Sequence, residues 1–169
     1  MPRGLVVEHP VSPPVIVIAA MTSDRVIGDG NGMPWNVPEE YAQFLRQVDG
    51  QSLSMGRRSF EIFGADLDHC TLLVVSRTLS SGGRPLVARS FEDALHLARE
   101  QQRTIFIGGG ASIYQQALPQ ADRLHLSVID GQYHGNAVFP PIDERVWRLE
   151  ETQQHARYRY HEYARTTRP

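Results

Sequence analysis

Lysine is absent from the 169-residue chain, and cysteine occurs once, as Cys70. All 17 basic residues are therefore arginine, which excludes a Schiff-base lysine and the lysine of a phosphate-binding P-loop. A single cysteine excludes an intramolecular disulfide and a zinc site with several thiolates. An excess of charge of one sign is also lacking, since the formal net charge is −2. The composition therefore gives no indication of nucleic acid or an anionic membrane surface as a partner.

Long hydrophobic runs are lacking as well. The longest apolar stretch, residues 13–21, is too short to span a bilayer. The first residues do not combine a basic segment with a long apolar one, as a secretory signal would. We therefore expect a cytoplasmic protein without a membrane partner. Hydrophobic residues make up 41% of the chain and charged residues 21%, which is typical of a globular protein.

A length of 169 residues predicts one domain. Residues 1–14 are rich in proline and show no hydrophobic periodicity, so we expect a loosely ordered leader before a single domain over residues 15–169. No repeat, block of charge or linker divides that domain. A chain of about this length buries roughly 68–70% of the surface it exposes when unfolded. Neither disulfides nor a structural metal is therefore needed. As a separate expectation, we take the protein to be a monomer.

Segments typical of strands and of helices alternate through most of the chain. The β-branched run at 15–20 predicts a strand buried on both faces, and the Gly- and Pro-rich segment 22–35 predicts a long functional loop. Pro38 is well placed as the first residue of a helix. Further strands are expected at 52–55, 71–76, 104–107 and 124–129, helices from about Arg57, after Ser90 and near Ala111, and an antiparallel hairpin from 147–151 and 158–164. This order predicts an α/β fold with a mostly parallel sheet and an antiparallel C-terminal edge.

A strand that runs into Gly108-Gly109-Gly110, with a helix expected from Ala111, is the strongest chemical feature. Backbone N–H groups of such a turn, together with the helix dipole, suit an anion such as a dinucleotide pyrophosphate. The spacing is not that of the Rossmann fingerprint. A tight turn without a ligand is the alternative interpretation.

Two further strand ends carry residues suited to phosphate. They are Gly56-Arg57-Arg58-Ser59 and Ser76-Arg77. Ligands of open α/β sheets bind at the carboxyl ends of strands, and guanidinium groups match phosphate. Together with the glycine turn, these ends would suit a nucleotide with a pyrophosphate and an extra phosphomonoester. Solvated surface arginines are the alternative.

Glu40 is the acid that we place against an apolar helix stripe, formed by Tyr41, Phe44, Leu45 and Val48. A buried carboxylate can bind a planar N–C–N edge through two hydrogen bonds. The alternative is an exposed first-turn glutamate that the helix dipole favours, a role that Glu39 fits better. The acids, histidine and cysteine within 66–70 are read as a polar loop rather than a metal site, so no metal is expected.

Residues 15–44 read VIVIAAMTSDRVIGDGNGMPWNVPEEYAQF, residues 55–61 MGRRSFE, residues 74–77 VVSR, and residues 107–114 IGGGASIY. These segments, with residues 124–130 and Phe139-Pro140, resemble the dihydrofolate reductase family. They keep the family's order and approximate spacing from about residue 15 to the C-terminus. On these motifs the chain is identified as a member of that family.

The resemblance implies a three-layer α/β/α fold with an eight-stranded, mostly parallel sheet. It implies NADPH as the cofactor and a small-molecule dihydropterin as the substrate. A hydride would pass from the nicotinamide to carbon 6 of 7,8-dihydrofolate, and the adjacent ring nitrogen would be protonated with the help of a buried carboxylate, giving tetrahydrofolate.

The resemblance also implies roles for individual residues. Glu40 would hold the pterin and support its protonation, Ser127 would back this carboxylate, Trp35 would help order a water near the acid, and Tyr114 would lie near the hydride path. The implied cofactor-binding residues are Ala20, Ile27, Met33, Gly56, Arg57, Arg58, Ser59, Ser76, Arg77, Gly109, Gly110, Ala111, Ser112 and Ile113. The implied substrate-binding residues are Ile18, Ala19, Glu40, Tyr41, Phe44, Gly108 and Ser127.

Two positions depart from the family pattern. Cys70 aligns with an arginine that clamps the glutamate carboxylate of folate, and cysteine cannot replace a bidentate guanidinium. Gly108 stands where a bulky aliphatic residue usually walls the substrate pocket. Both changes affect the tail side of the substrate, so one alternative is a dihydropterin with another tail, such as a methanopterin-like one. Otherwise Arg77 or His69 supplies the tail contact.

Two alternative functions belong to other classes of protein. A riboflavin-pathway pyrimidine reductase shares the fold and the use of NADPH but would not need Trp35 with Glu40. A non-catalytic binding module on this fold is the other reading.

Overall fold

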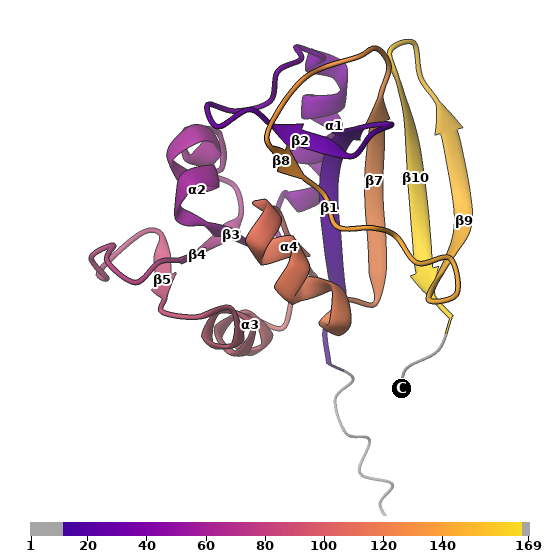
Figure 1. Cartoon of the computed structure of the whole chain (residues 1–169). Coiled ribbons are helices and arrows are strands. Elements are labelled where there is room, and N and C mark those ends of the chain that lie inside the picture. Colours follow the sequence, from indigo (N-terminus) through magenta and orange to yellow (C-terminus); the bar gives the residue numbers. More distant parts are fainter. Residues whose placement is uncertain (1–11, 167–169) are drawn as a thin grey trace, which may run out of the picture.

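The computed structural model describes residues 12–166, and Figure 1 shows their path. The expected leader, residues 1–14, lies mostly outside the described residues. Its last residue does contact the sheet, because the carbonyl of Pro14 accepts a hydrogen bond from the N–H of Ile105 at 2.9 Å.

An eight-stranded sheet forms the centre of the fold, with the strand order β5-β4-β3-β6-β1-β7-β10-β9. The strands are β1 (Val15–Thr22), β3 (Ser52–Gly56), β4 (Thr71–Val75), β5 (Leu86–Ala88), β6 (Ile105–Ile107), β7 (Arg123–Ile129), β9 (Trp147–Gln154) and β10 (Tyr158–Arg165). All neighbours from β5 to β7 are parallel, and β10 is antiparallel to both β7 and β9. The sheet and its antiparallel C-terminal edge are confirmed.

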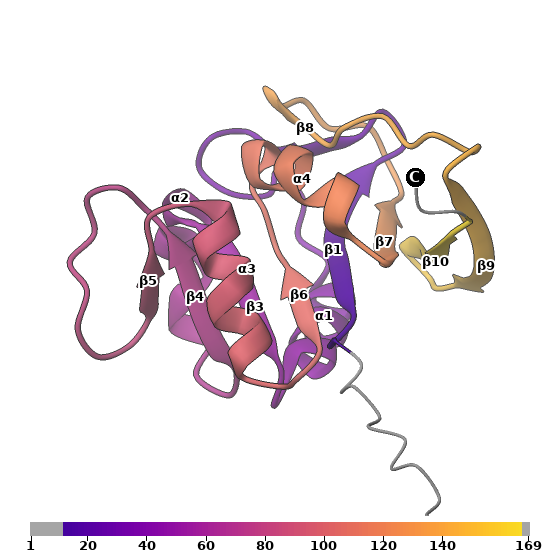
Figure 2. The same ribbon diagram turned by 90° about the horizontal axis from the view of Figure 1, so that it is seen from below.

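Helices cover both faces of this sheet (Figures 1 and 2). They are α1 (Pro38–Val48), α2 (Arg57–Phe63), α3 (Phe91–Glu100) and α4 (Ala111–Ala117), with 3₁₀ turns η1 (Gly64–Asp66) and η2 (Leu118–Gln120). Side chains of α3 and α4 pack with one core cluster, and side chains of α1 and α2 pack with a second. The three-layer arrangement is therefore confirmed.

Helix boundaries follow local signals in the sequence. Pro38 begins α1, where its missing N–H costs no hydrogen bond. Ser90 caps α3, since its hydroxyl oxygen accepts a hydrogen bond from the N–H of Asp93 at 3.1 Å. Helix α2 begins directly after β3, and α4 begins after the three glycines that follow β6, so the first turns of both helices lie at the carboxyl edge of the sheet.

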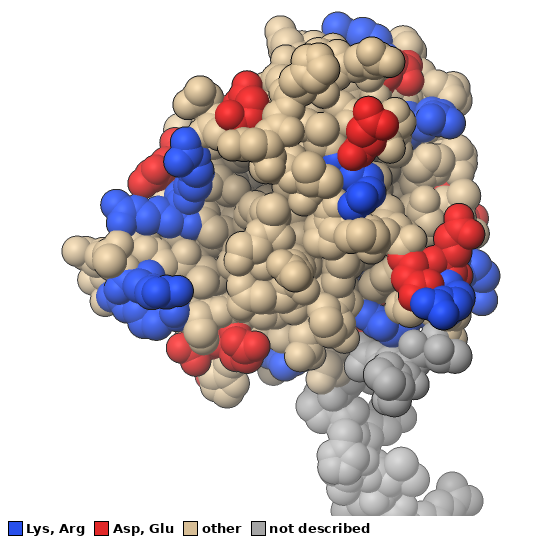
Figure 3. Space-filling view, viewed as in Figure 1, with Lys and Arg blue, Asp and Glu red and all other residues tan. Residues whose placement is uncertain are grey.

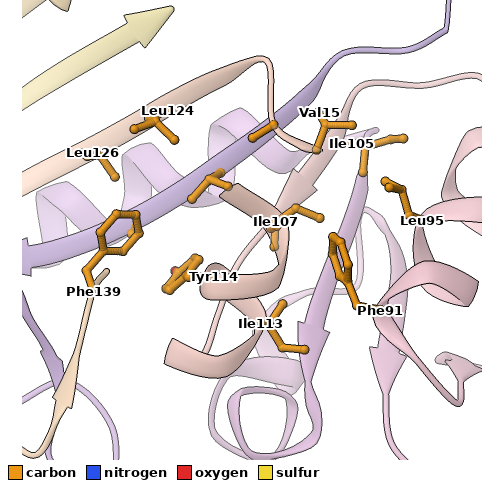
Figure 4. Close-up of a cluster of buried hydrophobic side chains, with 14 of the residues drawn as sticks. Val15, Phe91, Leu95, Ile105, Ile107, Ile113, Tyr114, Leu124, Leu126 and Phe139 are labelled. Atoms are coloured by element: carbon orange, nitrogen blue, oxygen red, sulfur yellow. The ribbon is translucent and has the colours of Figure 1, made fainter. Parts of the chain in front are cut away.

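Figure 4 shows the larger core, between β1, β6 and β7 and the helices α3 and α4. Val17, Ile105, Ile107, Leu124 and Leu126 are fully buried there. Each buried side chain of this size contributes about 1.5–3 kcal/mol relative to an exposed one. This rigid centre holds the ends of the strands in fixed positions.

Three short strands were not expected from the sequence. Strands β2 (Val26–Gly28) and β8 (Ala137–Val138) form a separate antiparallel pair, and β5 extends the main sheet. Two or three residues cannot show a period of two, and β5 follows a Gly- and Pro-rich segment typical of a loop. No helix within residues 12–166 is long and apolar enough to cross a membrane.

Candidate active site

A cleft of about 280 Å³ opens at the carboxyl ends of β1, β3 and β6, bordered by α1, α2 and α4. The residues predicted from the sequence that line it are Ile18, Ala19, Ala20, Ile27, Met33, Glu40, Tyr41, Phe44, Gly56, Arg58, Ser59, Gly108, Gly109, Gly110, Ala111 and Tyr114. The carboxyl ends of parallel strands meet here, as they do in other open α/β sheets that bind ligands.

Glu40 supplies the cleft's carboxylate. It lies in the first turn of α1 and is only 6% exposed. Burial raises the pKa of Glu40, and a hydrogen bond from the hydroxyl of Ser127, on β7, opposes that rise by favouring the charged form. A carboxyl group with a raised pKa inside an apolar cleft is typical of a proton-handling site.

The neighbouring Glu39 shows the contrast. It is exposed, and both of its carboxylate oxygens accept hydrogen bonds from Arg157, at 2.7 Å and 2.6 Å. This bond with Arg157 lowers the pKa of Glu39 to about 2. The two adjacent acids therefore differ as the sequence predicts, with Glu40 inside and Glu39 on the surface.

The glycine turn forms the wall beside β3 and α4. The carbonyl of Gly109 accepts a hydrogen bond from the N–H of Gly56 at 2.8 Å, which ties the turn to the end of β3. The peptide between Gly109 and Gly110 is cis, and Gly109 has φ of +107°. A Cβ at Gly109 would lie 3.2 Å from the hydroxyl of Tyr114. The bare backbone therefore leaves room in the cleft where a side chain would intrude.

Tyr114 is held by the floor of the cleft. It is 5% exposed, and its hydroxyl donates a hydrogen bond to the carbonyl of Ile18 at 2.8 Å. Burial, with the charge of Glu40 nearby, raises the pKa of Tyr114, so the hydroxyl stays protonated.

The arginine and serine side chains divide into two sets. Arg58 and Ser59 line the cleft, and the guanidinium of Arg58 donates to the carbonyl of Gly30 at 2.8 Å. Arg57 points instead toward the loop after β4, where it donates to the hydroxyl of Thr78 at 2.6 Å. Basic side chains gather at this side of the molecule, over α2 and the β5 end of the sheet (Figure 3).

Seven predicted residues do not line the cleft: Trp35, Arg57, Ser76, Arg77, Ser112, Ile113 and Ser127. Ile113 is buried in the core, whereas Ser112 and Arg77 are exposed. The hydroxyl of Ser76 accepts hydrogen bonds from the N–H groups of Thr78 and Leu79, so it shapes the turn after β4. Trp35 lies behind the cleft wall.

Trp35 is 6% exposed and packs edge-on against Tyr133, with ring centroids 5.7 Å apart. Its indole N–H is buried and has no hydrogen-bond partner among the described residues. A buried donor of this kind is suited to a bound water. The expected role for Trp35 stays a prediction.

Several lining residues were missed in the sequence. They are Gly28, Gly30, Gly32, Met55, Ile62, Phe63 and Ala137. The three glycines belong to the loop over residues 22–35, which the sequence predicts to be functional. The high glycine and proline content of that loop was the available signal for them. The α2 and β8 residues gave no signal, since both elements are too short to show a period.

The two departures from the family pattern fall at different places. A Cβ at Gly108 would lie 2.9 Å from Leu53 Cδ1, so Leu53 already occupies the space that a larger residue would take. Cys70 lies outside the cleft, in a second groove beside it that also includes His69. Within residues 12–166, no group of three or more His, Cys, Asp or Glu side chains could hold a metal ion.

The residues fit a nicotinamide dinucleotide. Bare glycine backbone opens the wall beside β3, Arg58 and Ser59 offer phosphate donors, and apolar side chains from β1 and β2 provide a dry surface for a ring. With the buried carboxylate of Glu40 in the same cleft, fold and site define the class of α/β proteins that bind a dinucleotide at the carboxyl ends of parallel strands.

Comparisons with known proteins identify the family. The family model described as dihydrofolate reductase matches residues 14–168. The dihydrofolate reductase of Haemophilus influenzae is 36% identical over 79% of this chain and 83% of its own length. The dihydrofolate reductase of Bacillus subtilis is 34% identical over 81% of this chain and 82% of its own length. A solved structure of dihydrofolate reductase from Enterococcus faecalis, complexed with NADP(H) and RAB-propyl, has a TM-score of 0.84 at 26% identity and covers 93% of this chain and 100% of its own.

The chain belongs to the dihydrofolate reductase family. The expected family, enzyme class and cofactor are thereby confirmed. Because the relatives are dihydrofolate reductases, the comparisons favour dihydrofolate reduction over the riboflavin-pathway reading.

Proposed function

We propose that this protein reduces 7,8-dihydrofolate to tetrahydrofolate with NADPH, using Glu40 as the carboxylate that binds the pterin. One observation carries the proposal. Glu40 is 6% exposed, lines the cleft opposite the glycine turn and accepts a hydrogen bond from Ser127. A buried acid in that position can pair with the 2-amino group and the ring N–H of a pterin through two hydrogen bonds.

The cofactor would lie along the other half of the cleft. Gly109 and Gly110 would border the nicotinamide end, and Arg58 and Ser59 the pyrophosphate, with Arg57, Ser76 and Arg77 beyond them. When bound, NADPH supplies the hydride that reduces carbon 6 of the pterin.

The chain's own residues would bind the pterin, guide the proton to it and exclude bulk water. Ile18 and Phe44 would pack against the two faces of the pterin, because both line the cleft beside Glu40. A carboxylate in a low-dielectric pocket stabilises the cationic, protonated pterin. Trp35, with its buried indole N–H, would help hold the water that carries the proton. Met33 and the loop around it would exclude bulk water from the hydride path.

The remaining expectations belong to the same proposal. The reductase domain would span residues 15–169, and the match of the family model to residues 14–168 supports this. The protein would be a monomer in the cytoplasm and would bind small molecules alone. The large exposed hydrophobic side chains Leu86 on β5 and Leu149 on β9 lie at different strands, which supports the monomer because they form no single apolar patch.

Steady-state oxidation of NADPH in the presence of dihydrofolate tests the proposal. Glu40→Gln should lower kcat/KM by about 10²–10⁴-fold, the usual contribution of a positioned acid or base. Glu39→Gln is the matched control, because the adjacent exposed acid faces away from the cleft and its loss should leave kcat/KM within about twofold of wild type. NADPH binding should survive both changes. Wild-type protein that binds NADPH but does not oxidise it with dihydrofolate would contradict the proposal.

A further inference from the structure

One side of α1 carries a row of polar residues that faces the antiparallel edge of the sheet. Glu39, Gln43 and Gln47 are spaced four residues apart, so they lie on the same face of the helix. Each of them accepts a hydrogen bond from a side chain of β7, of β10 or of the turn before β10. We call these three residues the polar stripe. Glu40 lies on the same helix, directly beside the first of them.

The sheet turns a polar face toward α1. In the β7–β10 pair, Tyr160 lies directly opposite Ser127, and directly opposed side chains project from the same face of a sheet. Leu124 and Leu126, at alternate positions of β7, are buried in the larger core on the other face. The face toward α1 therefore carries the polar side chains, and these include Ser127, the hydrogen-bond partner of Glu40.

Two members of the polar stripe are bonded to this face at partly buried positions. The hydroxyl of Tyr158, which is 2% exposed, donates to the side-chain oxygen of Gln43. His125 Nδ1 lies 2.7 Å from Gln47 Oε1, and the hydroxyl of Tyr160 lies 3.4 Å from the same oxygen. Because an amide oxygen only accepts hydrogen bonds, His125 donates from Nδ1. The middle and the last turn of α1 are therefore joined to both β7 and β10.

The remaining member of the polar stripe, Glu39, is open to solvent. Its ion pair with Arg157, at 2.6 Å, joins side chains that are 41% and 53% exposed. An exposed ion pair contributes little to stability. Gln43 and Gln47 are therefore the members of the polar stripe that can hold the helix on the sheet.

The position of α1 matters because Glu40 and Ser127 lie on different elements. Their hydrogen bond is only as constant as the distance between α1 and β7. The other titratable side chains near Glu40 are tyrosines: burial raises the pKa of Tyr41, Tyr114 and Tyr158, and the charge of Glu40 adds to the rise. All three tyrosines stay neutral at neutral pH. A displacement of α1 would therefore reach the pKa of Glu40 through its bond with Ser127.

We propose that Gln43 and Gln47 are positioning residues for Glu40. Through their hydrogen bonds to β7 and β10, they hold α1 at the distance from the sheet at which its buried carboxylate accepts the hydrogen bond of Ser127. Neither glutamine lines the cleft, so both act through the helix and not on a bound substrate. The consequence for the reaction rests on the proposed function.

Methionine tests the proposal, because it matches the length of glutamine and lacks the amide. In the double variant Gln43→Met with Gln47→Met, the bond between Ser127 and Glu40 should weaken, and the pKa of Glu40 should rise by roughly half a unit to one unit. NMR of isotope-labelled glutamate carboxyl groups in the ligand-free protein measures this pKa, with Glu40→Gln to assign the signal. Gln115→Met, at an exposed position of α4, is the matched control and should leave the pKa in place.

Two further variants separate positioning from a purely structural role. Tyr158→Phe removes the bond to Gln43 from the other side and keeps the buried ring, so it should raise the pKa of Glu40 no further when combined with Gln43→Met. In a Ser127→Ala background neither change should move the pKa, because the bond that they adjust is gone. A lower Tm with an unmoved pKa, or an equal rise in the Ser127→Ala background, would overturn the proposal.

Kinetics separate this inference from the proposed function. In the double methionine variant, the fall of kcat/KM for dihydrofolate should move to higher pH by the same amount as the pKa. KM for NADPH should stay within about twofold of wild type, since α1 borders the half of the cleft that the pterin would occupy. If wild-type protein does not reduce dihydrofolate, the proposed function fails and the NMR titration still decides the inference. If it does and the pKa of Glu40 is unmoved, only the inference fails.

Discussion

Ser127 on β7 donates a hydrogen bond to Glu40 on α1, and the two side chains are 3% and 6% exposed. The bond favours the charged carboxylate, whereas burial favours the neutral one and raises the pKa of Glu40. In the proposed reaction the protonated carboxyl of Glu40 is the source of the proton that the pterin takes up, and the carboxylate that remains then stabilises the cationic ring. The value of kcat/KM should therefore fall as the pH rises through the pKa of Glu40.

Ser127→Ala should therefore raise the pKa of Glu40 further and move that fall in kcat/KM to higher pH. A hydrogen bond to a charged group contributes about 1.5–3 kcal/mol, which corresponds to a displacement of roughly one to two pH units. The profile of kcat/KM between pH 5 and 10 measures it. Ser54→Ala, a buried serine on β3, is the control and should leave the profile in place. A profile that stays put or moves to lower pH in Ser127→Ala would disprove this coupling.

Gly135 lies against the loop that borders the cleft. A Cβ at Gly135 would come within 2.1 Å of the carbonyl oxygen of Gly28, which lines the cleft. Backbone cannot yield as a flexible side chain does, so Gly135→Ala should displace β2 and the residues after it. Misplacement of about 1 Å near the reacting groups can cost up to about 10²-fold in rate, and we expect kcat to fall at least tenfold. Asn136→Ala, at the exposed next position, should keep the wild-type rate.

Arg57 tests the assignment of the cofactor phosphates. Its guanidinium joins the end of β3 to the turn after β4 through Thr78, at the edge of the cleft where the extra phosphate of NADPH is expected. Arg57→Gln should raise KM for NADPH about tenfold, because a charge-assisted hydrogen bond of about 1.5–3 kcal/mol is lost. KM for NADH should not change. Arg99→Gln, which removes the same charge from α3, controls for long-range electrostatics. Equal loss for both nucleotides would place Arg57 away from that phosphate.

Much of the fold was predictable because the central elements are long and carry strong local signals. The β-branched run at the start of β1, the proline that begins α1 and the serine that caps α3 each act within a few residues. The glycine turn after β6 was visible for the same reason. Strands β2, β5 and β8 were not, since they exist only through pairing with distant segments.

The candidate site was predictable where a reactive side chain lies beside a clear structural signal in the sequence, and less predictable elsewhere. Glu40 could be placed inside because it borders an apolar stripe, and Glu39 outside. The second groove beside the cleft could not be foreseen, since it forms where the last turns of α1 meet the segment after α2. The sequence suggested Arg77 or His69 as a tail contact. His69 lines the second groove, and Arg77 lines neither that groove nor the cleft.

Tyr114→Phe isolates one buried hydrogen bond at the base of the cleft. The hydroxyl donates to the carbonyl of Ile18 at 2.8 Å, and its loss leaves that carbonyl buried without this donor. An unsatisfied buried acceptor costs about 1–3 kcal/mol, which in a domain of this size lowers Tm by roughly 2–10 °C. Thermal unfolding followed by circular dichroism measures the change. Tyr163→Phe, which alters a half-buried tyrosine on β10, should shift Tm by less. Ile18 and Tyr114 both line the cleft, so kcat should fall in Tyr114→Phe but not in Tyr163→Phe. If neither Tm nor kcat changes in Tyr114→Phe, this hydrogen bond does not hold the cleft in place.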